Sequence, residues 1–234
     1  RLQNYLSKWI KEKINDVLKS LIDLKNLKET NSSIRALAFQ LYENNGVLKR
    51  DNVSNYLKKM DQNERKILRN LGVKFGRYHI FLFKLLKPEA VSLRILLWKN
   101  YNQKFFNLKP PTFGLNFLEN KEFINKNFML LCGFENFENF FVRIDILERL
   151  FIQIINSALE NKNEIKLVPE MLNLLGCSKD NFIKLLKIMN YKTYKKDNDL
   201  YFKYSPKKQK IKKFIEKKTI KDNPFKVLKN INFK

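Results

Sequence analysis

The stretch VPEMLNLLGCSKDNFIKLLKIMNYKTYKKDNDLYFKY, Val168–Tyr204, carries the clearest fold information in the chain. Pro169 suits the first position of a short helix that runs to Leu175, and Gly176 then turns the chain. Ser178 can cap a second helix. The inward-facing residues of that second helix would be Phe182, Leu185, Leu186 and Met189.

The same stretch ends in a pattern typical of a β-hairpin. YKTYKK (191–196), the turn DND and LYFKY (200–204) supply two short aromatic-rich strands. Upstream, apolar residues at 144, 147, 150, 151 and 154 indicate a helix that ends near Glu160, and EIKL (164–167) offers a brief strand. This order of helix, strand, helix, turn, helix and hairpin is that of a winged helix-turn-helix domain.

Basic residues lie where such a domain would meet nucleic acid. The second helix of the pair presents its outer face to nucleic acid, and the hairpin reaches an adjacent backbone. The candidates are Lys179, Lys184 and Lys187 on the helix, and Lys192, Lys195 and Lys196 on the hairpin. The alternative is that these elements only pack against other proteins.

The first half of the chain reads as helices joined by tight turns, hence a helical bundle. An apolar stripe from Leu2 to Leu21 predicts a helix whose face must meet a partner surface. Ser32 or Ser33 can cap a second helix, and Asp61 with Glu64 resembles a capping box. A helix after Pro88 would bury Ala90, Leu93, Leu97, Trp98 and Tyr101.

Between these helices, residues 73–83 fit an extended segment. They lie in LGVKFGRYHIFLFKLLKP (71–88), where the neighbours of the single histidine are basic and aromatic residues rather than acids or a nucleophile. Such side chains are suited to binding the phosphates and the bases of nucleic acid. The candidate binding residues are Lys74, Arg77, Tyr78, His79, Lys84 and Lys87. Alternatively, His79 is a structural residue whose ring nitrogens are hydrogen-bonded within the protein. Gly72 and Gly76 would then only shape a turn.

Charge points to a polyanionic partner. Lys+Arg number 47 and Asp+Glu 23, for a net charge of +24. Residues 205–234 hold eleven lysines and two acids, as expected of a solvated basic arm that binds by counterion release. Two other readings stay open: codon bias of an AT-rich genome, and membrane-surface attachment by IKKFIEKKTI (211–220).

The sequence lacks the motifs that several kinds of functional site require. There is no GxxxxGK[ST] loop for ATP phosphates and no acidic strand end to hold magnesium. Cys132 and Cys177 have no partner spacing for zinc and are expected to be buried thiols, while Glu135 and Glu138 look like solvated surface. No run is long enough for a membrane span. We therefore predict no catalytic or metal site and no membrane, in a soluble intracellular protein.

Two motifs in order, IRALAFQLYENNGVLKR (34–50) and LGVKFGRYHIFLFKLLKPEAVSLRILLW (71–98), resemble the region after the motor domains in superfamily-two RNA helicases of the mitochondrial degradosome type, especially their alphaproteobacterial relatives. VPEMLNLLGCSKDNFIKLLKIMNY (168–191) and NPFKVL (223–228) also look like the distal part of those proteins. Phe83 departs from the pattern, since proline is expected there.

The resemblance implies a C-terminal accessory region of an ATP-dependent helicase. Its two RecA-like motor domains, with ATP and magnesium, would lie upstream in the same polypeptide, and this chain would carry no cofactor of its own. The implied partners are single-stranded RNA or DNA, the motor domains and an exoribonuclease. The implied location is the bacterial cytoplasm, with the mitochondrial matrix as the alternative.

The predicted organisation is mainly α, with four parts. Residues 1–108 form a helical accessory domain, 109–141 a Phe/Asn-rich connector, 142–204 a winged-helix-like domain with a small β-hairpin, and 205–234 a basic tail. Two alternatives to the helicase reading remain: a stand-alone winged-helix DNA-binding protein, and a purely structural docking surface for a nuclease or ribosome.

Overall fold

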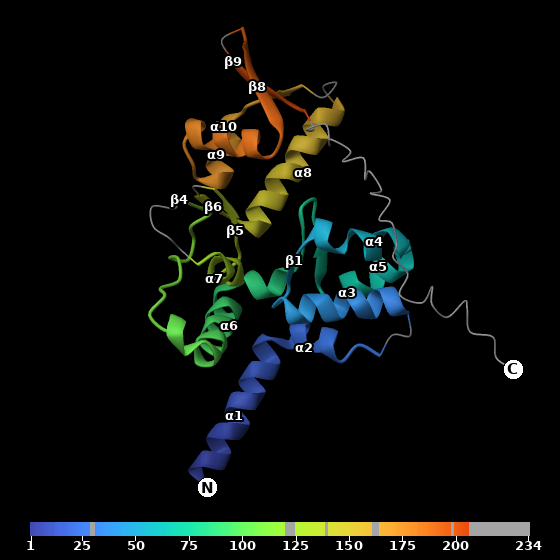
Figure 1. Ribbon diagram of the computed structural model, residues 1–234, viewed down its shortest axis with the longest axis vertical. Coiled ribbons are helices and arrows are strands. Elements are labelled where there is room, and N and C mark those ends of the chain that lie inside the picture. The colour runs from blue at the N-terminus through green and yellow to red at the C-terminus, as the bar shows by residue number, and fades with distance from the viewer. Residues whose placement is uncertain (29–30, 120–124, 139, 161–163, 198, 206–234) are drawn as a thin grey trace, which may run out of the picture.

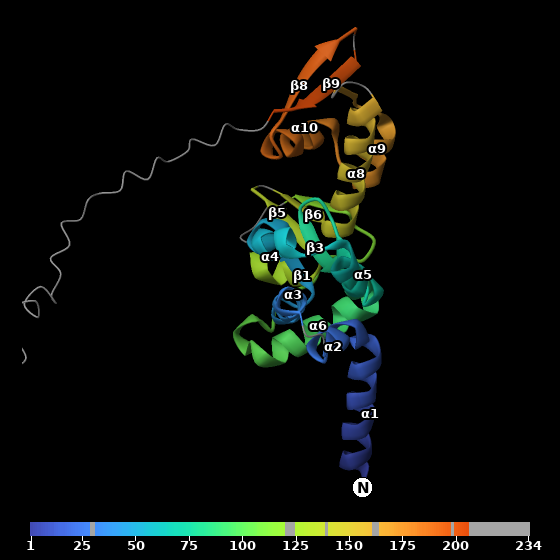
Figure 2. The same cartoon turned by 90° about the vertical axis from the view of Figure 1, so that its right-hand side faces the viewer.

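The computed structural model describes residues 1–28, 31–119, 125–138, 140–160, 164–197 and 199–205. Within them the chain forms ten α-helices and three antiparallel sheets of three strands each, so the protein is mainly α, as predicted (Figure 1). It is elongated, with α1 (Leu2–Val17) at one end and the hairpin of β8 (Tyr191–Lys196) and β9 (Asp199–Tyr204) at the other (Figures 1 and 2). Apart from Ser205, the predicted basic tail lies outside the described residues.

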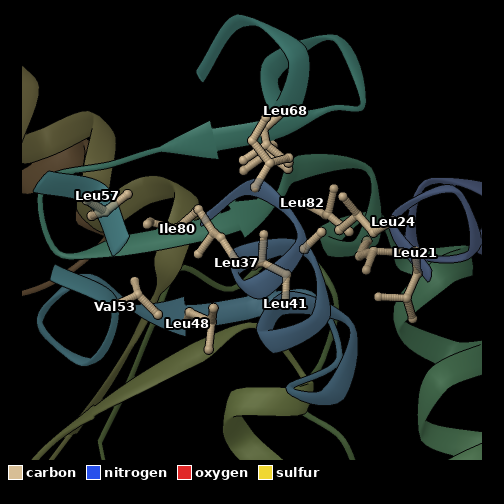
Figure 3. Packing of buried hydrophobic residues seen from close by; sticks show 14 of the residues in the cluster. Leu21, Leu24, Leu37, Leu41, Leu48, Val53, Leu57, Leu68, Ile80 and Leu82 are labelled. Atoms are coloured by element: carbon tan, nitrogen blue, oxygen red, sulfur yellow. The ribbon is translucent and has the colours of Figure 1, made fainter. Parts of the chain in front are cut away.

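The first core forms where helices cover a small sheet of order β1-β3-β2. The strands are β1 (Val47–Lys49), β2 (Val73–Phe75) and β3 (His79–Leu82), and the helices that contribute are α2 (Lys19–Lys25), α3 (Ser32–Glu43), α4 (Ser54–Lys59) and α5 (Gln62–Asn70). Figure 3 shows Leu37 and Leu41 of α3 close to Ile80 and Leu48 of the sheet. The bundle therefore includes a sheet, and the extended segment predicted within 73–83 supplies two of its strands.

Helix ends follow local capping chemistry. The Asp61 side chain accepts from the Glu64 amide, and Glu64 accepts from the Asp61 amide, so the predicted capping box forms. The cap of α3 is Asn31 rather than either predicted serine, because its side-chain oxygen accepts from the Ser33 amide. The first helix ends at Val17 instead of running to residue 21, and a separate helix, α2, follows.

Helix α6 (Pro88–Tyr101) begins at the predicted proline, but its buried face differs from the prediction. Tyr101 is 91% and Leu97 37% exposed, whereas Arg94 is buried. The guanidinium of Arg94 donates to the carbonyl oxygens of Asn45 at 2.8 Å and Leu85 at 2.5 Å, which allows a charged group to lie in the core. Burial lowers the pKa of Arg94 to about 10.

The segment predicted as a connector carries regular structure. It contains β4 (Phe117–Glu119), α7 (Lys126–Leu131) and β5 (Phe134–Phe137), and the expected boundary after residue 141 falls inside β6 (Phe140–Arg143). These strands form a sheet of order β4-β6-β5. The buried phenylalanines of this segment are Phe128 on α7 and Phe134, Phe137, Phe140 and Phe141 in the sheet.

The last part of the chain has the elements predicted for it. They are α8 (Ile144–Glu160), β7 (Ile165–Lys166), α9 (Pro169–Leu175), α10 (Lys179–Ile188), β8 and β9. Gly176 has a left-handed φ of 67°, and the Ser178 side chain accepts from the Asn181 amide at 3.3 Å. The sheet order is β7-β9-β8, and its inner face packs on α8 and α10. The remaining short elements are 3-10 turns η1 (Arg50–Val53), η2 (Phe83–Leu86) and η3 (Gln103–Phe105).

Candidate nucleic-acid interface

The turn between β2 and β3 is held by one carboxylate from the second half of the chain. Glu148 of α8 is 3% exposed and accepts hydrogen bonds from three consecutive backbone amides: Arg77, Tyr78 at 2.9 Å and His79 at 2.7 Å. A Cβ on Gly76 would lie 2.4 Å from the Glu148 carboxyl carbon, so only glycine lets the carboxylate approach this closely. The turn is thereby fixed against α8.

His79 adds a second link between the two halves. Its ring is 2% exposed, with Nδ1 3.1 Å from Glu148 and Nε2 2.8 Å from Glu135 of β5. Glu135 also accepts from Lys49 Nζ at 2.8 Å. Both ring nitrogens face carboxylates, which only accept, so the arrangement requires the charged imidazolium. The histidine is thus the structural residue that the sequence left as an alternative, and its buried ring cannot stack on a base.

The ionisation of this cluster follows from its contacts. Burial lowers the pKa of His79, but the hydrogen bonds and charges of Glu135 and Glu148 outweigh burial and raise the pKa above its ordinary 6.5. Burial likewise raises the pKa of Glu135, but His79 and Lys49 outweigh it and bring this pKa below 4.5.

These two shifts define a pH window. A raised histidine pKa stabilises the fold fully below pH 6.5, and the contribution is lost as the pH rises through the raised value. A lowered carboxyl pKa stabilises fully above pH 4.5 and is lost as the pH falls through the lowered value. Both contributions are complete between pH 4.5 and 6.5.

The clamped turn places Arg77 beside the last sheet. Arg77 is exposed and lines a cavity of about 150 Å³ with Tyr191, Tyr204 and residues of α8. Tyr78, its neighbour, is half-buried and packs edge-on against Phe151, with ring centroids 4.7 Å apart. Arg77 is therefore brought to the base of the β8–β9 hairpin, more than a hundred residues away in the sequence, whereas Tyr78 belongs to the core.

The predicted lysines of α10 are all exposed. Phe182, Leu185 and Leu186 are buried, and helical geometry places Lys184 and Lys187 on the opposite face. Lys179 lies at the start of the helix. This face is free of contacts with the buried core and points outward as expected.

The hairpin lysines divide between two faces. Because side chains alternate along a strand, Lys192 and Lys196 share one face of β8, and Lys195 lies on the other. Lys192 is paired directly with Lys203 of β9, a residue that the sequence analysis did not select. Strict alternation in YKTYKK could have revealed this division.

The other predicted residues lie elsewhere. Lys74 is exposed on β2, and Lys84 is exposed on η2, but neither lines the cavity beside Arg77. Lys87 lines a different cavity of about 190 Å³ with Phe83, Arg143 and the loop at 110–115. The six candidates near the histidine therefore do not form one continuous group.

The sequence analysis missed the two glutamates. Glu135, expected at the surface, is 7% exposed, because it pairs with the buried His79 and with the Nζ of Lys49, which is itself exposed. Glu148 lies among apolar residues of α8, between Leu147 and Phe151. Because an acid is seldom buried unless it is paired, this position was the sequence signal for an internal partner.

Both cysteines are free thiols, but only Cys132 is buried as predicted. Cys132 is buried and Cys177 is half-buried; burial raises their pKa values to about 12 and about 11. Among the residues that the structure describes, no group of three or more His, Cys, Asp or Glu side chains is arranged to hold a metal ion. No helix in the described part of the chain is both long and apolar enough to cross a bilayer.

Comparison with known proteins adds no relative: no family model, no curated protein and no solved structure matches this chain.

Proposed function

We propose that this chain is the nucleic-acid-binding and motor-docking region of an ATP-dependent RNA helicase. The observation that carries the proposal is the position of Arg77. A buried carboxylate fixes its backbone, and its side chain is exposed at the base of the basic hairpin, where it lines a cavity with Tyr204, itself 44% exposed. Cations beside aromatic rings are what single-stranded nucleic acid requires of a protein.

The last part of the chain is proposed to act as a winged helix. The order α8, β7, α9, α10, β8, β9 supports this reading, with α9 and α10 as the helix pair and the hairpin as the wing. Lys184 and Lys187 would then track phosphates from the outer face of α10. The net charge of +24 would raise the rate at which the region meets a strand.

Motor docking is proposed for helix α1. Its large apolar residues are exposed, with Leu2 at 73%, Trp9 at 54% and Ile10 at 48%. The N-terminal part of the helix extends away from the rest of the molecule (Figure 2), whereas its C-terminal end packs on the first core through Ile14 and Val17. The partner surface would belong to the RecA-like motor domains of the same polypeptide, which would hold ATP and magnesium.

The test is a titration with a fluorescein-labelled single-stranded RNA of twenty uridines, read by anisotropy over a range of salt concentrations. Arg77→Ala is compared with Arg35→Ala, which removes an equal charge from the exposed surface of α3. We expect the first variant alone to weaken binding, and to reduce the salt slope by about 0.7 for a lost phosphate contact on a single strand. Equal behaviour of the two variants would remove the basis of the proposal.

A second candidate, a stand-alone winged-helix DNA-binding protein, is favoured by the outward lysines of α10. It requires duplex DNA to bind more tightly than single-stranded RNA at matched salt, because a recognition helix enters a groove. Binding no tighter than that of an unrelated protein of equal charge would instead favour a purely structural docking role.

A further inference from the structure

The outer face of the sheet β7-β9-β8 carries an ordered set of side chains. Register pairs Tyr194 with Tyr201, and Lys192 with Lys203, so each pair projects on the same side of the sheet. The opposite side carries the buried residues of both strands, Tyr191, Leu200 and Phe202. The first set therefore faces away from the core.

The two tyrosines form a small aromatic surface. Their rings are nearly parallel, with an interplanar angle of 19° and centroids 6.0 Å apart. Both residues are half-exposed. The Tyr194 phenolic oxygen is itself buried, so the area that this residue shows to solvent is mainly ring.

The two lysines are placed at a cost to folding. Like charges directly opposite each other in a sheet are destabilising. Lys192 and Lys203 are both exposed, and within the described chain neither forms an ion pair with an acid. An anion bound between them would remove this repulsion.

The remaining charges on this sheet only partly offset the pair. Asp199 bonds to Lys166 of β7, so its charge is already matched. Lys196, which pairs with Asp199 in register, adds a further exposed cation at the tip. Glu164, just before β7, interacts with the Tyr194 side chain, so its carboxylate lies at this face. The face as a whole keeps an excess of positive charge.

We infer that this face is a stacking platform for single-stranded RNA, with bases on Tyr194 and Tyr201 and phosphates at Lys192 and Lys203. The inference rests on the proposed function and names its binding surface. Two residues along a strand span about 6.6 Å. Each lysine therefore lies about as far from the neighbouring tyrosine as the phosphate of a nucleotide lies from its base. In a duplex the base faces are covered by neighbouring pairs, so an aromatic sheet face selects unpaired bases.

The platform is distinct from the outer face of α10. A helix face of lysines can follow a duplex backbone, but it offers no ring to a base. The hairpin extends beyond the helices at the end of the molecule (Figures 1 and 2), which leaves its outer face open to an extended strand.

The experiment measures binding of fluorescein-labelled ten-nucleotide uridine RNA and of duplex RNA of the same length, at fixed salt. Tyr201→Leu removes one ring, and Tyr101→Leu is the matched control because Tyr101 is 91% exposed on α6. We expect Tyr201→Leu to weaken single-strand binding at least about 5-fold, since a stacked base contributes at least about 1 kcal/mol. Duplex binding and the control should be unchanged, and Tyr201→Phe should bind like the unmodified protein.

A charge-matched pair gives an independent readout. Lys192→Ala removes a cation from the platform, and Lys58→Ala removes one from the exposed surface of α4. Only the first should lower affinity and reduce the salt slope. This pair decides the question if Tyr201→Leu fails to fold, as judged by circular dichroism.

The possible outcomes distinguish failure of the platform from failure of the proposed function. If Tyr201→Leu matches Tyr101→Leu, or Lys192→Ala matches Lys58→Ala, while Arg77→Ala still weakens RNA binding, the platform is overturned and the proposed function stands. If the unmodified protein binds RNA no better than an unrelated protein of equal charge, the proposed function itself is overturned. Preference for duplex over single strand would also overturn the platform.

Discussion

Replacement of Glu148 by glutamine tests the clamp that joins the two halves of the chain. The carboxylate accepts from three backbone amides and from His79 Nδ1. A glutamine retains one oxygen but places an amide N–H₂ where the other oxygen accepts from Arg77. The variant therefore leaves a buried imidazolium with one charged partner fewer and two N–H groups facing each other.

The expected loss follows from these contacts. Each buried donor left unpaired costs about 1–3 kcal/mol, so two cost about 2–6 kcal/mol. Removal of one partner from a buried ion pair costs about 3–5 kcal/mol in measured cases, in agreement with that sum. For a chain of this size about 1 kcal/mol corresponds to about 2–4 °C, so the midpoint of thermal unfolding should fall by about 6–20 °C.

The assay is urea unfolding at pH 6, followed by circular dichroism at 222 nm, for Glu148→Gln and for Glu43→Gln. Glu43 is exposed at the end of α3, and its replacement should change the unfolding free energy by less than about 0.5 kcal/mol. An unchanged slope with denaturant would show that stability alone has changed. A loss below about 1 kcal/mol for Glu148→Gln, or a loss equal to that of the control, would refute the clamp.

Three further predictions concern the same molecule. Gly76→Ala should destabilise by about 1–3 kcal/mol in urea unfolding, because the new methyl group would overlap the Glu148 carboxylate; unchanged stability would contradict this. Stability of the unmodified protein should be highest between pH 4.5 and 6.5 and fall on both sides, and His79→Gln should lack the fall above pH 6.5 that belongs to the histidine; parallel profiles would count against the charged imidazolium. Ser178→Ala should cost about 1 kcal/mol through loss of the α10 cap, measured by thermal unfolding, and no change would exclude a capping role.

Local elements were largely predictable. Pro169, Gly176 and Ser178 act on neighbours within four residues, so their sequence order alone predicts two helices and the turn between them. The capping box at Asp61 is of the same kind. Where the cap was misassigned at Ser32 or Ser33, three adjacent residues all had suitable side chains, and the backbone path selected Asn31.

Predictions that depend on long-range packing were wrong in two places. The Phe/Asn-rich segment has no clear period, because its strands are only three or four residues long and both faces of β5 and β6 contribute buried residues. The α6 stripe was wrong at Leu97 and Tyr101 for a related reason: Arg94, which looks like a surface residue, is buried and donates to the carbonyls of Asn45 and Leu85.

By itself the sequence determined a mainly helical protein with a terminal hairpin, strong positive charge and well-capped helices, because these depend on composition and on interactions within a few residues. Only the tertiary structure decided that His79 is buried between Glu135 and Glu148, partners 56 and 69 residues away, and that Arg77 reaches the hairpin. A charged side chain is stable in the interior only when its counter-charges converge on it, and that convergence depends on the whole path of the chain.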